Sequence, residues 1–231
     1  MTFDPTNIKA VLFDFDDTLA ETLPGRQSAV QYAFVAAGVD SPTADEFLKT
    51  VNGRTFNQGF MDISNSYGRD LDLLNLYRER YWTAEADNSP LFEGVREAVL
   101  SIHSHGFKLA LVTSKIRSFN FKGRSLGAQY QMEISGINHL FDILVGGEDV
   151  KLHKPDPESI KLAVRKLGIT ADEALMIGDS TADIGAANAA GCWSCHAVWA
   201  GTPPGPPLEG IRPDFVAEKP SQVLQILGIV D

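Results

Sequence analysis

Residues 11–19 run from three apolar side chains directly into three aspartates, Asp14, Asp16 and Asp17. The apolar half is typical of a buried strand. In an open α/β sheet, ligands bind just beyond the carboxyl ends of the strands, so these aspartates lie where an active site is expected. The alternative is an acidic turn, because aspartate side chains often accept hydrogen bonds from nearby backbone N–H groups. Matching chemistry further along the chain decides between the two.

The alternation of strand and helix patterns from residue 93 onward predicts a mostly parallel sheet with helices on both faces. No strand pattern occurs between residues 19 and 93, where helical spacing dominates. We therefore expect an α/β, Rossmann-like doubly wound core with an inserted all-helical cap domain. The predicted core comprises residues 1–22 and 91–231, and the cap residues 23–90.

Composition and charge argue against several classes of protein and partner. Apolar residues make up 44% of the 231 residues and charged residues 22%, which argues against disorder. The net charge of -10 argues against nucleic acid or a membrane surface as partner. No apolar run approaches the ~20 residues that span a bilayer, and we expect a cytoplasmic protein. An anionic substrate would need a metal ion or locally placed cations.

Polar residues follow the predicted strands at four places. They are Asp14 to Thr18, Thr113, the lysines Lys151 and Lys154, and the pair Asp179 and Asp183. Carboxylates brought within about 5 Å repel by roughly 3 kcal/mol per pair, so the cluster requires a cation or shifted pKa values. Oxygen ligands beside a lysine and a hydroxyl suit Mg²⁺ and a phosphate group, and aspartate can act as a nucleophile. The pattern indicates magnesium-assisted phosphoryl transfer through aspartate.

On these motifs the sequence resembles the haloacid dehalogenase-like (HAD) hydrolase superfamily, most closely its phosphoglycolate phosphatase-type branch with a helical cap. The motifs that carry the resemblance occur in the family's order and cover nearly the whole chain: Asp14-Phe-Asp16-Asp-Thr18, Leu111-Val-Thr113-Ser-Lys115, Lys154-Pro-Asp-Pro and Gly178-Asp179-Ser-Thr-Ala-Asp183. The resemblance implies a phosphatase that hydrolyses a phosphate monoester of a small phosphorylated metabolite.

The resemblance also implies the catalytic roles. Asp14 would attack phosphorus and form an aspartyl phosphate. Asp16 would protonate the leaving oxygen and then activate water. Thr113 and Ser114 would contact the phosphoryl group, and Lys154 would offset its charge.

A further implication is a metal site. Asp14, Asp179 and the backbone carbonyl of Asp16 would bind Mg²⁺, and Asp183 would support the metal. In the predicted cap, Arg54 is the candidate for holding a substrate anion, with a solvated arginine as the alternative.

Four features of the sequence leave questions open. Lys151 could replace Lys154 as the lysine that faces the phosphate. Asp17 stands where this branch more often has glycine. Cys192 and Cys195 form a C-x-x-C, with His196 even a haem-attachment pattern, but they lie in a predicted strand, which favours packing. Residues 116–135 are the least regular part, and we expect a helix there.

Two other functions compete with the phosphatase. A phosphosugar mutase of the β-phosphoglucomutase type would use the same Asp14 and Asp16 and return the phosphoryl group to sugar. A non-catalytic binding or regulatory protein could keep the scaffold, although every catalytic position holds a competent residue. We expect a monomer or homodimer, and nothing in the sequence selects the substrate.

Overall fold

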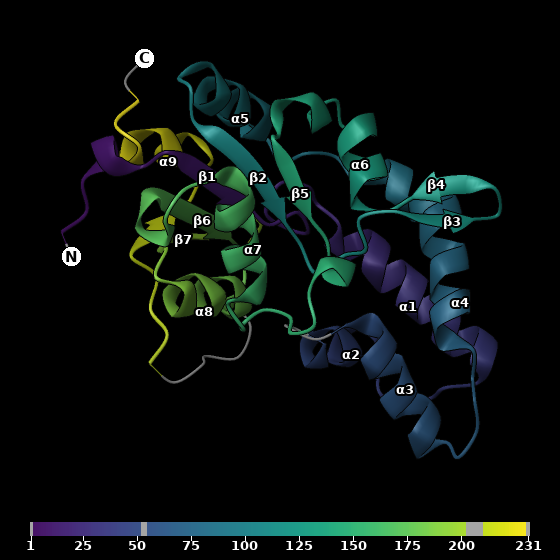
Figure 1. Cartoon of the computed structure of the whole chain (residues 1–231). Coiled ribbons are helices and arrows are strands. Elements are labelled where there is room, and N and C mark those ends of the chain that lie inside the picture. Colours follow the sequence, from purple (N-terminus) through teal and green to yellow (C-terminus); the bar gives the residue numbers. More distant parts are fainter. Residues whose placement is uncertain (1, 52–54, 202–209, 230–231) are drawn as a thin grey trace.

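The computed structural model describes residues 2–51, 55–201 and 210–229. Its main sheet is parallel throughout, with the strand order β5-β2-β1-β6-β7-β8 (Figure 1). The strands are β1 (Ala10–Phe13), β2 (Lys108–Val112), β5 (Ile143–Val145), β6 (Ala174–Gly178), β7 (Trp193–Ala197) and β8 (Phe215–Ala217). These strands confirm the alternation of strand and helix that is predicted after residue 93.

The first strand lies in the middle of this sheet. β1 pairs with β2 on one side and with β6 on the other, so its backbone groups are satisfied on both edges. Its side chains alternate between two hydrophobic clusters. Val11 and Phe13 pack on one face of the sheet, whereas Leu12 packs on the other. An uninterrupted apolar run is therefore what this central position requires.

Helices cover both faces of the sheet (Figure 1). One face packs against α5 (Val95–Ser104), α6 (Ala128–Ile134) and α9 (Ser221–Ile226), and the other against α7 (Glu158–Leu167) and α8 (Thr181–Ala190). This arrangement confirms the predicted doubly wound α/β class.

The inserted helices form their own hydrophobic core. They are α1 (Leu23–Ala37), α2 (Ala44–Thr50), α3 (Phe56–Ser66), α4 (Leu73–Arg80) and a π-helical turn at Tyr81–Glu85. Phe34, Phe47 and Phe60 pack together within this helical domain. A capping box begins α2 at Thr43, whose hydroxyl accepts a hydrogen bond from the backbone N–H of Glu46. The exact domain boundaries stay a prediction.

The prediction of a helix over residues 116–135 is wrong for its first half. A hairpin of β3 (Phe119–Phe121) and β4 (Arg124–Leu126) occupies that part, and helix α6 follows. The two turn residues, Lys122 and Gly123, have φ of 49° and 80°. A two-residue hairpin turn requires positive φ at both positions, whereas the residues of an α-helix have negative φ.

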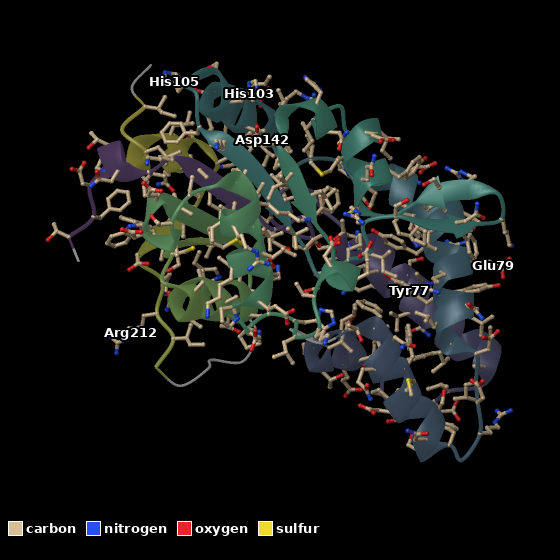
Figure 2. All side chains as sticks on the ribbon, in the orientation of Figure 1. Tyr77, Glu79, His103, His105, Asp142 and Arg212 are labelled. Atoms are coloured by element: carbon tan, nitrogen blue, oxygen red, sulfur yellow. The ribbon has the colours of Figure 1, made fainter. Side chains whose placement is uncertain are left out.

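The hairpin leaves the α/β core and packs against the helical domain. Leu126 is 1% exposed and belongs to the hydrophobic cluster of that domain, and Phe119 packs against the same cluster. An ion pair between Lys122 and Glu79 joins the hairpin to α4. Figure 2 shows Glu79 on the hairpin side of α4. The hairpin thus connects the two domains.

Candidate active site

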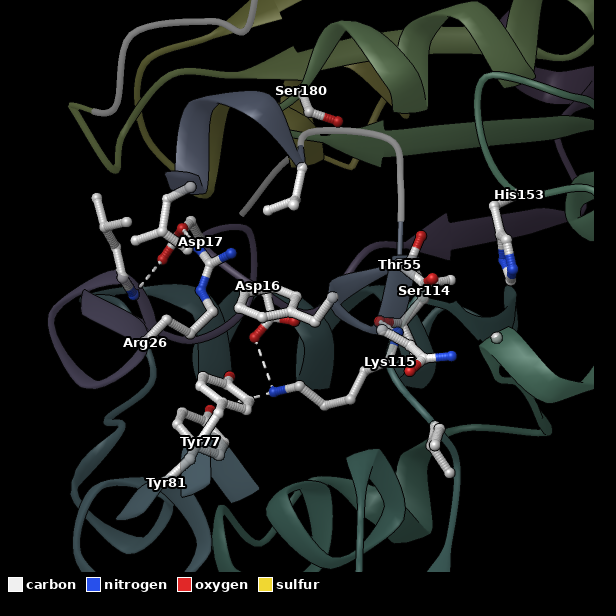
Figure 3. Close-up of a pocket in the computed structure, with 18 of the residues that line it drawn as sticks. Asp16, Asp17, Arg26, Thr55, Tyr77, Tyr81, Ser114, Lys115, His153 and Ser180 are labelled. Carbon is white, nitrogen blue, oxygen red and sulfur yellow. Dashed lines mark hydrogen bonds and ion pairs between the residues drawn. The ribbon is translucent and has the colours of Figure 1, made fainter. Parts of the chain in front are cut away.

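The predicted site residues converge at the carboxyl edge of the sheet. Asp14 follows β1, Thr113 follows β2 and Asp179 follows β6. The backbone N–H of Asp14 donates to the carbonyl of Ile177 at 2.9 Å, which keeps this loop in register with β6. These residues line a cavity of about 1150 Å³ whose walls come from both domains (Figure 3).

A buried lysine joins two of the aspartates. Nζ of Lys154 lies 2.6 Å from Oδ1 of Asp14 and 2.5 Å from Oδ1 of Asp183. It also donates to the carbonyl of Val112 at 3.1 Å, so all three of its N–H donors are used. Lys151 is exposed and does not line the cavity. The structure therefore brings Lys154, and not Lys151, to the aspartates.

Three aspartates form a cluster that fits a metal ion. One carboxylate oxygen from each of Asp14, Asp179 and Asp183 lies within 4.8 Å of the other two. Burial raises the pKa of Asp14 to about 7 and holds the pKa of Asp179 well above its usual value. Hydroxyl groups support the cluster: Thr18 donates to Asp179 at 3.2 Å, and Ser180 donates to Asp183 at 2.5 Å.

Asp179 makes no ion pair with any lysine or arginine of residues 2–51, 55–201 or 210–229. A buried carboxylate without a cation is costly, and a divalent ion with a preference for oxygen ligands would remove that cost. The donor set therefore fits Mg²⁺, as the sequence predicts.

Asp16 points toward Lys115 (Figure 3). Nζ of Lys115 lies 2.8 Å from Oδ1 of Asp16, and it also donates to Gln131 at 2.6 Å and to the hydroxyl of Tyr81 at 3.2 Å. Burial would raise the pKa of Asp16, but Lys115 and Arg26 outweigh it and lower the pKa to about 2. This network was not predicted, although Lys115 belongs to the second motif.

Asp17 binds the first helix of the helical domain. Its backbone is left-handed, with φ of 59°, which explains why glycine suits this position. Its carboxylate accepts hydrogen bonds from the backbone N–H groups of Thr22, at 3.0 Å, and Leu23, at 2.9 Å, and pairs with Arg26. Glycine could adopt this backbone but could not make these contacts.

Of the remaining predicted site residues, two line the cavity and one lies outside the described residues. Thr113 is buried at the cavity and its hydroxyl accepts a hydrogen bond from the backbone N–H of Lys115 at 3.1 Å. Ser114 also lines the cavity (Figure 3). Arg54 lies outside the described residues, so the structure does not place it.

The two cysteines lie away from the cavity. Cys192 and Cys195 are buried in different hydrophobic clusters, on opposite faces of the sheet. Burial raises the pKa of each thiol to about 12. Both observations agree with the predicted packing role.

This combination of a doubly wound sheet, an inserted helical domain and an aspartate–lysine cluster matches one family. A family model described as haloacid dehalogenase-like hydrolase matches residues 11–197. The chain belongs to this family. The predicted superfamily and the prediction of an enzyme are therefore confirmed.

Individual relatives cover almost the whole chain. A phosphoglycolate phosphatase of Vibrio parahaemolyticus is 31% identical over 96% of this chain and 97% of its own. The pyrophosphatase PpaX of Listeria monocytogenes is 29% identical over 95% of this chain and 96% of its own.

Solved structures share the fold. A predicted phosphoglycolate phosphatase from Haemophilus somnus has a TM-score of 0.76 at 23% identity, over 95% of this chain and 98% of its own. A putative β-phosphoglucomutase from Thermotoga maritima has a TM-score of 0.71 at 22% identity, over 97% of this chain and 100% of its own. Within the part of the chain that the structure describes, no helix combines the length and apolar character needed to cross a membrane.

Proposed function

We propose that this protein is a magnesium-dependent phosphatase that hydrolyses the phosphate monoester of a small metabolite through an aspartyl phosphate. The observation that carries the proposal is the contact of Lys154 with Asp14 beside the other two carboxylates of the cluster. A nucleophile, a cation for the phosphoryl charge and a metal-binding set share one cavity. Relatives named phosphoglycolate phosphatase and pyrophosphatase support the reaction class.

In the proposed first step, a carboxylate oxygen of Asp14 forms a bond to phosphorus while the bond from phosphorus to the leaving oxygen breaks. Asp16 gives its proton to that leaving oxygen. Lys154 and the hydroxyl groups of Thr113 and Ser114 bind the phosphoryl oxygens and offset their charge.

In the second step, Asp16 takes a proton from water, and the water oxygen attacks the phosphorus of the phosphorylated Asp14. Lys115 stabilises the ionised form of Asp16, which is the form needed here. Proton donation in the first step needs the protonated form, so the contact with Lys115 must loosen when substrate is bound.

The metal would be held by Asp14, Asp179, Asp183 and the backbone carbonyl of Asp16. When bound, Mg²⁺ would supply positive charge to the phosphoryl oxygens. The helical domain would act as a cap that excludes bulk water from the cavity. We also keep two predictions as part of the proposal: that Arg54 binds a substrate anion and that the protein resides in the cytoplasm.

The test is phosphate release from a panel of small phosphate esters, with Mg²⁺, with chelator and with the variant Asp14→Asn. We expect release that requires Mg²⁺ and is abolished in Asp14→Asn. Absence of release from every ester by folded protein would overturn the proposal. Phosphorus NMR on the same samples identifies the mutase alternative, because a mutase yields an isomeric sugar phosphate instead of free phosphate.

A further inference from the structure

Three cations that line the cavity are neutralised by carboxylates. The pairs are Lys154 with Asp14 and Asp183, Lys115 with Asp16, and Arg26 with Asp17. Arg78 of α4 lines the same cavity but is different. In the described ranges it has no carboxylate within ion-pair distance. Lys49 of α2 also lines the cavity without an ion pair among the described residues, but it is exposed, whereas Arg78 is half-buried. Arg78 is thus a half-buried cation of the cavity wall that no described carboxylate neutralises.

The nearest acidic residues along the chain do not serve Arg78. Glu79 pairs with Lys122 of the hairpin, and Glu85 pairs with Arg80. Arg78 is only partly exposed, and burial lowers its pKa from the usual value. A half-buried guanidinium without a counter-ion is less stable than a paired one, and an anionic ligand would correct this.

The hairpin fixes the orientation of Arg78. The guanidinium carbon lies 5.1 Å from the centroid of the Phe119 ring, a distance at which a cation is attracted to an aromatic face. Phe119 is itself held by Trp82, with ring centroids 5.7 Å apart in an edge-to-face arrangement. Among the described residues the guanidinium of Arg78 makes no hydrogen bond, so its N–H donors are free for a ligand.

The same residues form one wall of the cavity. Leu74, Arg78 and Trp82 follow one another at four-residue spacing along α4 and the turn after it, and all three line the cavity with Phe119. Tyr77, one residue before Arg78, lines it as well and packs against Tyr81 (Figure 3). Arg78 therefore belongs to the cavity that holds Asp14, on the wall formed by the helical domain and the hairpin.

We propose that Arg78, held by the ring of Phe119, binds a second anionic group of the substrate while the phosphoryl group lies at Asp14. The group would be a carboxylate or a second phosphoryl group, since a guanidinium pairs with either through two parallel hydrogen bonds. This inference rests on the proposed phosphatase function and adds a preference for substrates that carry a second negative charge.

The test uses two pairs of substrates that differ in the second charge. Phosphoglycolate is compared with its uncharged amide, and pyrophosphate with methyl phosphate, so that the two pairs distinguish a carboxylate from a phosphoryl group. We call the compound with a second anionic group the charged member of its pair, and the compound without it the uncharged member. The wild type should prefer the charged member of at least one pair. In Arg78→Met, kcat/KM for that member should fall about 10- to 100-fold, mainly through KM, because charge-assisted hydrogen bonds are lost. For the uncharged member it should change less than about 3-fold.

Two further variants separate ligand binding from structural effects. Arg69→Met removes an exposed arginine of the same domain that does not line the cavity, and it should leave both substrates unaffected. Phe119→Leu keeps Arg78 but removes the ring that orients it, and should lower kcat/KM for the charged member about 3- to 10-fold. It serves as the test if Arg78→Met does not fold.

Equal losses for charged and uncharged members in these variants would overturn the inference and indicate a structural role for Arg78. A wild type without preference for either charged member would overturn it too, while leaving the phosphatase in place. A wild type that releases phosphate from none of the four compounds, nor from the wider ester panel, would instead overturn the proposed function, and this inference with it.

Discussion

Replacing Asp179 by asparagine should separate the stability of the metal-free protein from its response to Mg²⁺. Asp179 lies in the cluster with Asp14 and Asp183, and Lys154 neutralises only the latter two. We expect metal-free Asp179→Asn to be more stable than metal-free wild type. We also expect it to lose the stabilisation that Mg²⁺ gives the wild type.

The magnitude follows from the distances. Two charges 4.8 Å apart repel by roughly 3.5 kcal/mol at an effective dielectric of about 20. Partial protonation of the cluster reduces this, so we expect Asp179→Asn to gain about 1–2 kcal/mol without metal. Mg²⁺ at about 100 times its dissociation constant should stabilise the wild type by about 2.7 kcal/mol. For a chain of this length, that is a rise in Tm of about 5–11 °C.

The assay is thermal unfolding followed by circular dichroism at neutral pH, in chelator and in a series of Mg²⁺ concentrations. The wild type should show a Tm that rises with Mg²⁺, whereas Asp179→Asn should change by less than about 2 °C. Asp40→Asn is the matched control, because Asp40 is exposed and lies outside the cluster. It should keep the wild-type response.

Either of two results would refute this reasoning. If Mg²⁺ raises the Tm of Asp179→Asn as much as that of the wild type, Asp179 does not contribute to the metal site. If metal-free Asp179→Asn is less stable than the metal-free wild type, repulsion within the cluster does not dominate at this position.

Three other predictions follow from charge and burial. Because burial raises the folded-state pKa of Asp14 to about 7, the metal-free wild type should lose stability relative to Asp14→Asn as the pH rises from about 4 to 7, measured by urea unfolding. Lys115→Met should lower the free energy of unfolding by about 3–5 kcal/mol, because it removes the cation that pairs directly with Asp16; a loss below 1 kcal/mol in urea titration would contradict this. Cys192 and Cys195, with thiol pKa values of about 12, should not react with a thiol reagent at pH 7 until the protein unfolds; prompt labelling of the native protein would show that they are accessible.

Much of the architecture could be predicted from local pattern. The alternation of strand and helix after residue 93 was sufficient for the doubly wound sheet, because periodicity reports which side of an element is buried. Polar residues directly after strands were sufficient to expect Asp14, Thr113 and Asp179 at one edge, since parallel strands end on the same side. The hairpin was missed because its turn depends on positive φ at Lys122, a residue that seldom adopts it.

The choice among candidate side chains required the tertiary structure. Sequence left Lys151 and Lys154 as alternatives, and only the packing of the loop against β1 and β2 brings Lys154 to Asp14. The contact of Lys115 with Asp16 joins residues far apart in the chain, as does that of Arg78 with Phe119. The sequence by itself determined which elements form and which edge carries the chemistry, because those depend on local periodicity and strand direction. The tertiary structure decided which charges are paired and which remain unpaired in the cavity wall, because pairing depends on distances between segments that no local pattern records.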